Sequence, residues 1–203
     1  MHLQTRRLIL EPVGETAQPQ EFLPVFNSNP DFIEASEQFS GKRSYDLAEV
    51  EMYLWQESVR DNSRCLAIRL RETGALVGTA ALVAPHPDGP YPWIGLLLID
   101  GTRQRQGLGT EAATAVEQAL AEEGWTEIRL SVMRANPDAR RFWERLGYAV
   151  YGERPDNDKR PCWLMRKLLV PGRQTALSRL LSLNAPVADW PQMEEEIIQG
   201  HLA

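Results

Sequence analysis

The spacing of hydrophobic residues along the chain predicts the order of its strands and helices. Alternation of hydrophobic and polar residues over 127–133 indicates a strand with one buried face, whereas hydrophobic residues four apart over 108–124 indicate an amphipathic helix. The spacing of hydrophobic residues, together with the residues that begin and end each segment, predicts strands over 4–13, 64–71, 76–84, 93–99, 127–133, 148–152 and 162–170. It predicts helices over 20–26, 46–59, 108–124 and 136–147.

Three segments need a separate interpretation. Residues 93–99 are hydrophobic almost throughout, which is typical of a central strand buried on both faces, and Gly95 within them predicts a bulge or a point of close approach. Residues 85–92 contain four prolines and one glycine and are therefore expected to form a loop. Residues 27–45 are polar and aromatic and predict a long loop with a helical turn, and such loops often carry function.

This order of elements predicts an α/β domain over residues 1–170, with a single mixed, mostly antiparallel sheet flanked by helices on both faces. Residues 171–203 are too few for a second domain and predict a C-terminal helical extension, with Asp189 as the cap of a short helix. The leucines of this extension would be exposed if it stood alone. We therefore expect them to pack on the domain or on a second copy of the chain, so a homodimer is one interpretation.

Composition and charge narrow the functional classes. The 203 residues carry a formal charge of −6, which argues against nucleic acid as a partner and is compatible with a cationic substrate. No hydrophobic run approaches the roughly 18 to 20 residues of a membrane helix, and the N-terminal apolar stretch is too short for a signal peptide. Cys65 and Cys162 lack the spacing of metal ligands. We expect reduced thiols in a cytoplasmic protein with no metal and no membrane attachment.

The strongest chemical signal is the turn between strand 93–99 and helix 108–124. Gly107 and Gly109 let the backbone curl tightly at the helix start and leave its amides uncovered. The unpaired N–H groups and the positive dipole end of a helix bind a phosphate or diphosphate. A P-loop would require Lys followed by Ser or Thr where Thr110 and Glu111 stand, and a dinucleotide-binding fingerprint would require three glycines near the start of the domain.

Arginines accompany this turn on an otherwise acidic chain. Arg103 and Arg105 lie within it, and Arg134, Arg140 and Arg141 follow later in the sequence. A basic cluster on an acidic protein predicts a specific site for an anion.

The turn and a second motif together resemble one family. The sequence Gln104-Arg105-Gln106-Gly107-Leu108-Gly109 is similar to the signature of the GNAT acetyltransferases. A second stretch resembles the family's second motif: Asn136 and Ala139, followed by Phe142-Trp143-Glu144-Arg145-Leu146-Gly147-Tyr148. The opening Thr5-Arg6-Arg7-Leu8-Ile9-Leu10 resembles the subgroup that includes ribosomal-protein N-terminal acetyltransferases. The resemblance covers residues 4–170 in the expected order.

The resemblance implies acetyl-coenzyme A as the cosubstrate. The strand backbone would pair with the pantetheine arm where strands 93–99 and 127–133 splay apart, and the N–H of Leu97 would act in catalysis by polarising the thioester carbonyl. The amides of the turn would bind the diphosphate, and three residues of the second motif would line the thiol end. The implied cofactor-binding residues are Leu97, Leu98, Ile99, Gln104, Arg105, Gln106, Gly107, Leu108, Gly109, Thr110, Asn136, Ala139 and Phe142.

The acceptor implied by the family is a primary amine, and the sequence does not choose among a protein N-terminus, a polyamine, an amino acid and an aminoglycoside. The amine must lose a proton before it attacks, so a base is required. Four acidic or imidazole side chains on loops expected to border the acceptor are candidates: Glu34, Glu37, His86 and Asp88.

The chain lacks the usual side-chain proton donor for the departing thiolate. Trp143 stands where many relatives have a tyrosine, and Ala139 stands where the ribosomal subgroup has a serine. Neither residue has an acidic proton to give, so water, Ser131 or Tyr148 would have to serve. A catalytically weak or inactive acyl-coenzyme A-binding regulatory protein is therefore the alternative hypothesis.

Overall fold

The computed structural model describes residues 1–14, 18–37, 40–87 and 89–170, and residues Met1–Val170 form one compact unit. The predictions for residues 171–203 lie outside the described residues and stay predictions. The strands are β1 (Leu3–Gln4), β2 (Leu8–Pro12), β3 (Ser63–Leu70), β4 (Leu76–Val83), β5 (Trp93–Ile99), β6 (Glu127–Met133), β7 (Ala149–Pro155) and β8 (Pro161–Leu168). The helices are α1 (Pro19–Asn27), α2 (Pro30–Ser36), α3 (Leu47–Val59), the short 3-10 helix η1 (Gly101–Arg103), α4 (Leu108–Glu122) and α5 (Pro137–Arg145).

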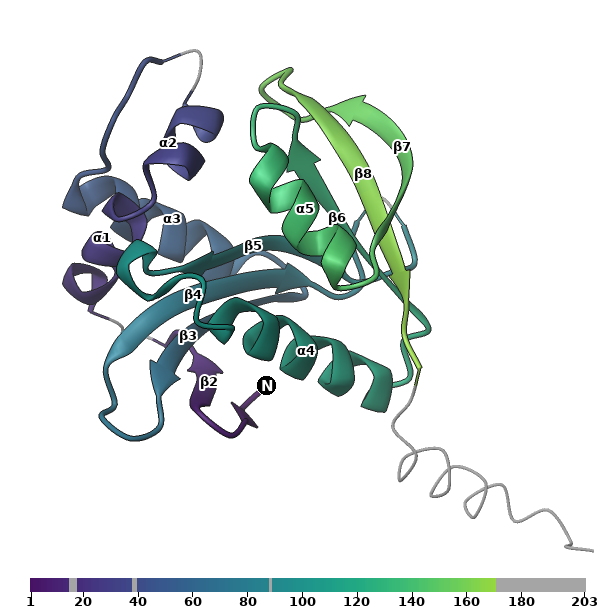
Figure 1. The fold of residues 1–203 in the computed structure, drawn as a ribbon, viewed down its shortest axis with the longest axis horizontal. Helices are drawn as coiled ribbons and strands as arrows, with labels where there is room; N and C mark the ends of the chain where they lie inside the picture. Colours follow the sequence, from purple (N-terminus) through teal and green to yellow (C-terminus); the bar gives the residue numbers. More distant parts are fainter. Residues whose placement is uncertain (15–17, 38–39, 88, 171–203) are drawn as a thin grey trace, which may run out of the picture. The chain divides into compact units, whose positions relative to one another are not determined.

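The strands form one sheet in the order β1-β2-β3-β4-β5-β6-β8-β7 (Figure 1). Neighbouring strands are antiparallel except for β5 and β6, which are parallel and are connected through α4. The predicted α/β fold with a mixed, mostly antiparallel sheet and helices on both faces is confirmed.

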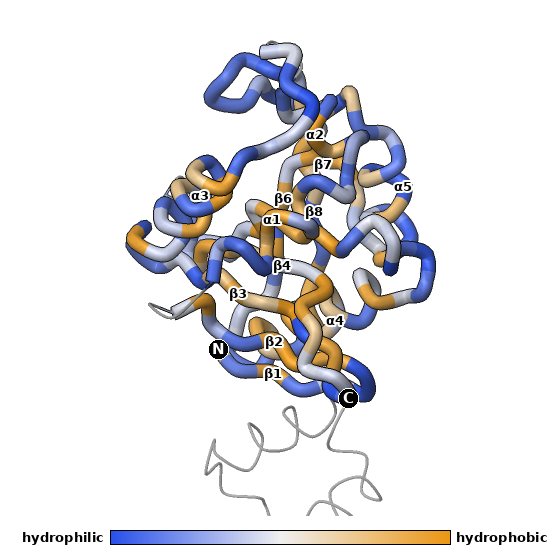
Figure 2. Tube along the Cα trace, turned by 90° about the vertical axis from the view of Figure 1, so that its left-hand side faces the viewer, coloured by the Kyte–Doolittle hydropathy of each residue, from blue (hydrophilic) through white to orange (hydrophobic). Residues whose placement is uncertain are grey.

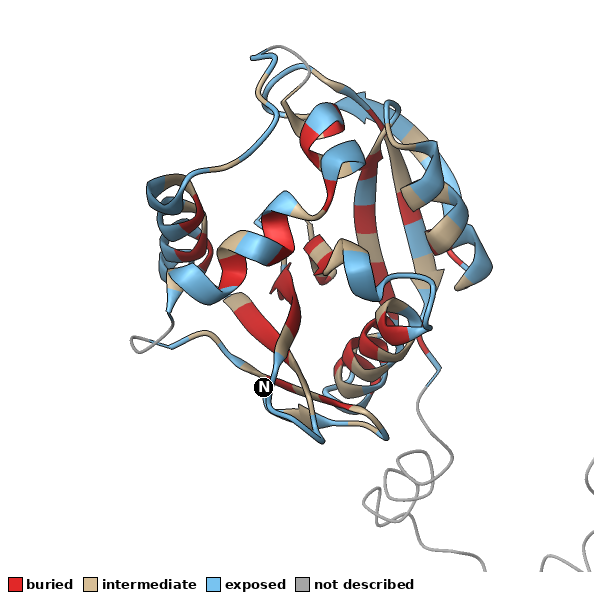
Figure 3. Cartoon of the chain, turned by 60° about the vertical axis from the view of Figure 1, so that its left-hand side comes forward, coloured by how far each residue is buried: buried red, intermediate tan, exposed pale blue. Residues whose placement is uncertain are grey.

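Different helices cover the two faces of this sheet. On β3, Leu66 and Ile68 are buried in the same cluster as the apolar face of α4, whereas Cys65 and Ala67 are buried with α1 and α3. This division follows from the alternation of side chains along a strand. Figure 3 shows buried residues on both the central strands and the inner sides of these helices.

The parallel strands β5 and β6 pair over only two residues of β5, Trp93 and Ile94, and then separate. The predicted bulge at Gly95 is confirmed, because Gly95 has no partner in the β4–β5 register. Within the described residues, the edge of β5 that faces β6 therefore has no strand partner from Gly95 to Ile99. The bulge and the separation both begin at the same point of the strand.

One N-terminal segment differs from the prediction, and two other predicted features there are found in the structure. The single strand predicted over 4–13 is divided into β1 and β2, because Thr5 closes a turn in which the Leu8 N–H donates to its hydroxyl at 2.8 Å. The helical turn predicted within the loop over 27–45 is α2, which begins at Pro30, a residue suited to the first helical turn. Asp46 caps α3 as predicted, since it accepts a hydrogen bond from the Glu49 N–H at 2.9 Å.

Hydrophobic residues gather where the helices meet the sheet, while the connection between α2 and α3 is mainly hydrophilic (Figure 2). Every helix in the described part of the chain is too short or too polar to cross a membrane.

Candidate active site

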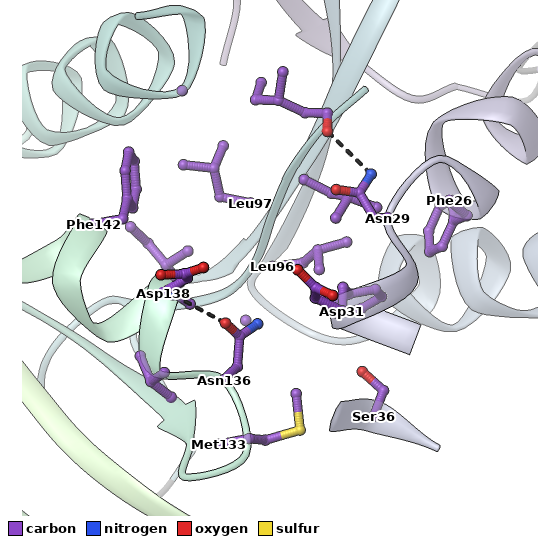
Figure 4. A pocket seen from close by; sticks show the side chains of 18 of the residues that line it. Phe26, Asn29, Asp31, Ser36, Leu96, Leu97, Met133, Asn136, Asp138 and Phe142 are labelled. Carbon is purple, nitrogen blue, oxygen red and sulfur yellow. Dashed lines mark hydrogen bonds between the residues drawn. The ribbon is translucent and has the colours of Figure 1, made fainter. Parts of the chain in front are cut away.

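A cavity of about 1390 Å³ opens where β5 separates from β6. Its walls come from α2, α3, β5, the turn before α4, β6, α5 and the β7–β8 turn. Figure 4 shows Phe142 and Asn136 on one side, Asn29 and Asp31 on the opposite side, and Leu97 between them.

The structure brings most of the sequence-predicted site residues to this cavity. Gln106 and Leu108 do not line it. Leu108 is the first residue of α4, and its side chain is buried in the core, so only its backbone faces the turn. The predicted residues that line the cavity are Leu97, Leu98, Ile99, Gln104, Arg105, Gly107, Gly109, Thr110, Asn136, Ala139 and Phe142.

The turn before α4 has the backbone geometry of an anion site. Gly107 is the N-cap of α4 with φ of +79°, a left-handed conformation that favours glycine. A Cβ on Gly109 would lie in ordinary van der Waals contact with the Phe142 ring, at 3.5 Å, so α5 packs directly against the start of α4. The first amides of α4 have no intrahelical partner and lie at the positive end of the helix dipole.

The five arginines of the predicted anion site do not act as one group. Arg134 pairs with Glu153 at 3.3 Å, Arg140 with Glu144 at 2.7 Å, and Arg141 with Asp138. Arg103 and Arg105 are exposed in the turn, and their side chains form no ion pair within the described part of the chain. Of the five arginines, the two without an ion pair among the described residues, Arg103 and Arg105, therefore lie in the turn itself.

Gln104 fastens the turn to the α1–α2 junction. Its side-chain amide donates to the Asn29 Oδ1 at 2.5 Å, and Asn29 donates to the Ile99 carbonyl at 3.1 Å. Beside them, the Gly101 N–H donates to the Ser28 hydroxyl at 2.8 Å, and a Cβ on Gly101 would lie 2.0 Å from the Ser28 carbonyl oxygen. Sequence reasoning missed Ser28, Asn29 and Gly101, because partners about 70 residues apart leave no periodic signal.

The second motif places its residues at the other end of the turn. Asn136 caps α5 by accepting the Ala139 N–H at 3.0 Å, and the Phe142 ring lies against Gly109. Trp143 is buried and its ring centroid lies 5.0 Å from that of Tyr148.

The two hydroxyl candidates for the proton donor are separated by this packing. Tyr148 does not line the cavity, and burial together with the nearby Glu117 carboxylate raises its pKa well above the ordinary value. Ser131 is exposed and lines the cavity. Ser131 is therefore the better placed of the two.

The candidate bases are separated in the same way. Glu37 lines the cavity and accepts hydrogen bonds from Ser40 at 2.7 Å and from the Tyr45 hydroxyl at 3.2 Å. Burial, followed by the Glu37 charge, raises the pKa of Tyr45 to about 12. Glu34 and His86 do not line the cavity, and Asp88 lies outside the described residues.

Arg160 joins the β7–β8 turn to α2 across the end of the cavity that is remote from the glycine turn. It donates to the Ser36 carbonyl and pairs with Asp156 at 2.6 Å and Asp158 at 2.7 Å. Its side chain is only 18% exposed. This contact, 124 residues apart in sequence, was not predicted.

The model of the acetyltransferase (GNAT) family matches residues 30–148, which is more than half of the chain. This chain belongs to the GNAT acetyltransferase family. The resemblance inferred from the sequence is confirmed, and the protein is an acetyltransferase. A comparison with curated protein sequences finds no match.

Solved structures share the GNAT fold. A GCN5-related N-acetyltransferase from Brucella melitensis is 20% identical with a TM-score of 0.69, over 94% of this chain and 89% of that one. A GNAT-family protein from Chromobacterium violaceum is 13% identical with a TM-score of 0.70, over 82% and 85% of the two chains. Ard1 from Thermoplasma volcanium is 18% identical with a TM-score of 0.55, over 80% and 98%. At these identities the likeness concerns the fold alone.

Proposed function

We propose that this acetyltransferase moves an acetyl group from acetyl-coenzyme A directly to a primary amine. One observation carries the proposal: the unpaired edge of β5, the glycine turn before α4 and the start of α5 border a single cavity. The turn suits a diphosphate, the strand edge suits an arm that contains amides, and the start of α5 lies where a thioester would end.

The residues of the turn fit the anionic part of this cosubstrate. The left-handed Gly107 leaves the first amides of α4 uncovered, and Arg103 and Arg105 supply positive charge beside them. In this proposal the amides from Gln104 to Thr110 hold the diphosphate, those of Gln106 and Leu108 included. Leu97, Leu98 and Ile99 hold the pantetheine arm, and Asn136, Ala139 and Phe142 border the thioester, which supplies the activated acetyl group.

The chain's own groups would then act on three atoms. The Leu97 N–H donates to the thioester carbonyl oxygen and stabilises the charge that develops there when the amine nitrogen attacks the carbon. Glu37, directly or through water, takes the proton that the amine loses. A carbon–nitrogen bond forms, the carbon–sulfur bond breaks, and the sulfur leaves with its electron pair and takes a proton from water or Ser131.

In this proposal the acceptor binds at the part of the cavity that α2, α3 and the β7–β8 turn line. A protein N-terminus, a polyamine, an amino acid and an aminoglycoside all supply the primary amine that the proposal requires. The cytoplasmic location and the homodimer inferred from the sequence stay predictions.

A second candidate function rests on Trp143 and Ala139, which cannot donate a proton to sulfur. It is an acyl-coenzyme A-binding regulatory protein with weak or no catalysis. Calorimetry with acetyl-coenzyme A, followed by turnover against a panel of amines, tests both candidates. Binding with turnover supports the enzyme, binding without turnover on any amine supports the regulatory protein, and the absence of binding refutes both.

A further inference from the structure

An acidic side chain lies unexpectedly close to the proposed diphosphate site. Glu111 belongs to the first turn of α4, four residues after Gly107. A carboxylate there repels a diphosphate bound to the same helix start. Its charge is maintained: burial raises the pKa of Glu111, but hydrogen bonds from Thr5 and Arg7 outweigh burial and hold that pKa below its ordinary value.

The turn between β1 and β2 compensates this charge. The Arg7 N–H donates to Glu111 Oε1 at 2.8 Å, its Nε donates to Oε2 at 2.7 Å, and the Thr5 hydroxyl donates to Oε1 at 2.5 Å. The Glu111 side chain is 17% exposed, so this pair is screened less by water than a surface ion pair. Two segments 104 residues apart in sequence thus form one charge-neutral cluster.

Arg7 also contacts the backbone of the glycine turn. Its Nη1 donates to the Gln106 carbonyl oxygen at 2.9 Å. Because a trans peptide is planar, its C=O and N–H point in opposite directions, so the Gly107 N–H points away from Arg7. Within the described part of the chain, that N–H donates to no other group. Gly107 lines the cavity, and its N–H remains available to a ligand.

The β1–β2 turn is itself held in place by Arg71, the residue that directly follows β3. The Arg71 N–H donates to the Arg7 carbonyl at 2.9 Å, and the Arg71 guanidinium donates to the Thr5 carbonyl at 2.8 Å. Neighbouring Arg6, in contrast, is exposed. The two adjacent arginines therefore have different roles, although the sequence alone does not distinguish them.

We propose that Arg7 is a positioning residue of the coenzyme A site, which orients the Gln106–Gly107 peptide for the diphosphate and neutralises Glu111 beside it. The inference rests on the proposed function, since it assumes that the diphosphate binds at this turn. It makes the N-terminal residues part of the cosubstrate site, although they do not line the cavity.

The test is a calorimetric measurement of the acetyl-coenzyme A dissociation constant for matched variants, with thermal unfolding recorded for each. Arg7→Ala removes both contacts and is expected to weaken binding by about tenfold, the range of a lost charge-assisted hydrogen bond. Arg6→Ala is the control and should bind like the wild type. Arg7→Lys keeps the charge but cannot reach both Gln106 and Glu111 in the arginine geometry, so it should fall between the two.

The double variant Arg7→Ala/Glu111→Gln separates positioning from mere structural support. Removing the uncompensated carboxylate should restore part of the lost affinity, so the double variant should bind more tightly than Arg7→Ala alone. A purely structural role predicts the opposite, because a second contact of the same cluster is lost. If the wild type binds acetyl-coenzyme A and Arg7→Ala binds it equally tightly, the inference is wrong. It is also wrong if the double variant recovers no affinity. Either result leaves the proposed function standing. No binding by the wild type refutes the proposed function, and the inference with it.

Discussion

Replacing Gly107 with valine tests the assignment of the glycine turn most directly. The backbone at Gly107 has φ of +79°, and a side chain there costs about 1–3 kcal/mol of folding free energy. A Cβ would meet only the Arg7 Nη2, at 3.4 Å, so the fold itself has room for it. The branched side chain would, however, cover the amides that face the proposed diphosphate. We expect the acetyl-coenzyme A affinity to fall at least about tenfold, or about 1.4 kcal/mol.

Gly74→Val is a matched control for this variant. Gly74 has φ of +71° in the β3–β4 hairpin, nothing lies within 4 Å of its Cβ position, and it does not line the cavity. Both variants should therefore lose similar stability, a fall in Tm of about 2–4 °C for each kcal/mol in a chain of this size. Only Gly107→Val should lose affinity in calorimetry. Equal affinities of the two variants would refute the assignment of the turn.

Three further predictions concern the chemistry, the acceptor and stability. Trp143→Tyr should increase turnover with an amine by restoring a proton donor, whereas loss of activity in Trp143→Phe with intact cosubstrate binding would show a direct role of the indole. Arg160→Ala should raise the KM of the acceptor severalfold by freeing the β7–β8 turn from α2, without changing acetyl-coenzyme A affinity, and Arg134→Ala, which breaks an exposed pair, should change neither. Burial raises the pKa of Glu57, so the folded state binds more protons there and loses stability as pH rises through the pKa. Glu57→Gln should then raise Tm at pH 7 and leave it unchanged at pH 3, and an equal shift at both pH values would contradict this.

The sequence by itself determined the elements and the glycine turn. Hydrophobic periodicity depends only on which residues face the core, so it located α4 and β6 and identified β5 as a strand buried on both faces. The bulge at Gly95 and the cap at Asp46 were also predictable, because both depend on the local preferences of one or two residues. The two family motifs were recognisable because each is contiguous.

Tertiary structure decided which of the predicted candidates share the site. The sequence does not favour Ser131 or Tyr148 as the proton donor. In the structure the packing of α5 buries Tyr148 beside Glu117, whereas Ser131 lines the cavity. Glu34 lies on α2 and Glu37 directly follows it, but Glu34 is exposed away from the cavity, whereas Glu37 lines it.

The contacts that hold the site together were also invisible in the sequence. Gln104 meets Asn29 across 75 residues, and Arg7 meets Glu111 across 104. Both contacts join a polar side chain to a partner on a different element, and such pairs follow neither the period of a helix nor that of a strand. Periodicity reports whether a residue faces the core, whereas the partner of a polar side chain depends on how distant elements are packed. The glycines and amides of the turn could therefore be recognised from its own residues, whereas the contacts that hold the turn in place depend on the tertiary structure.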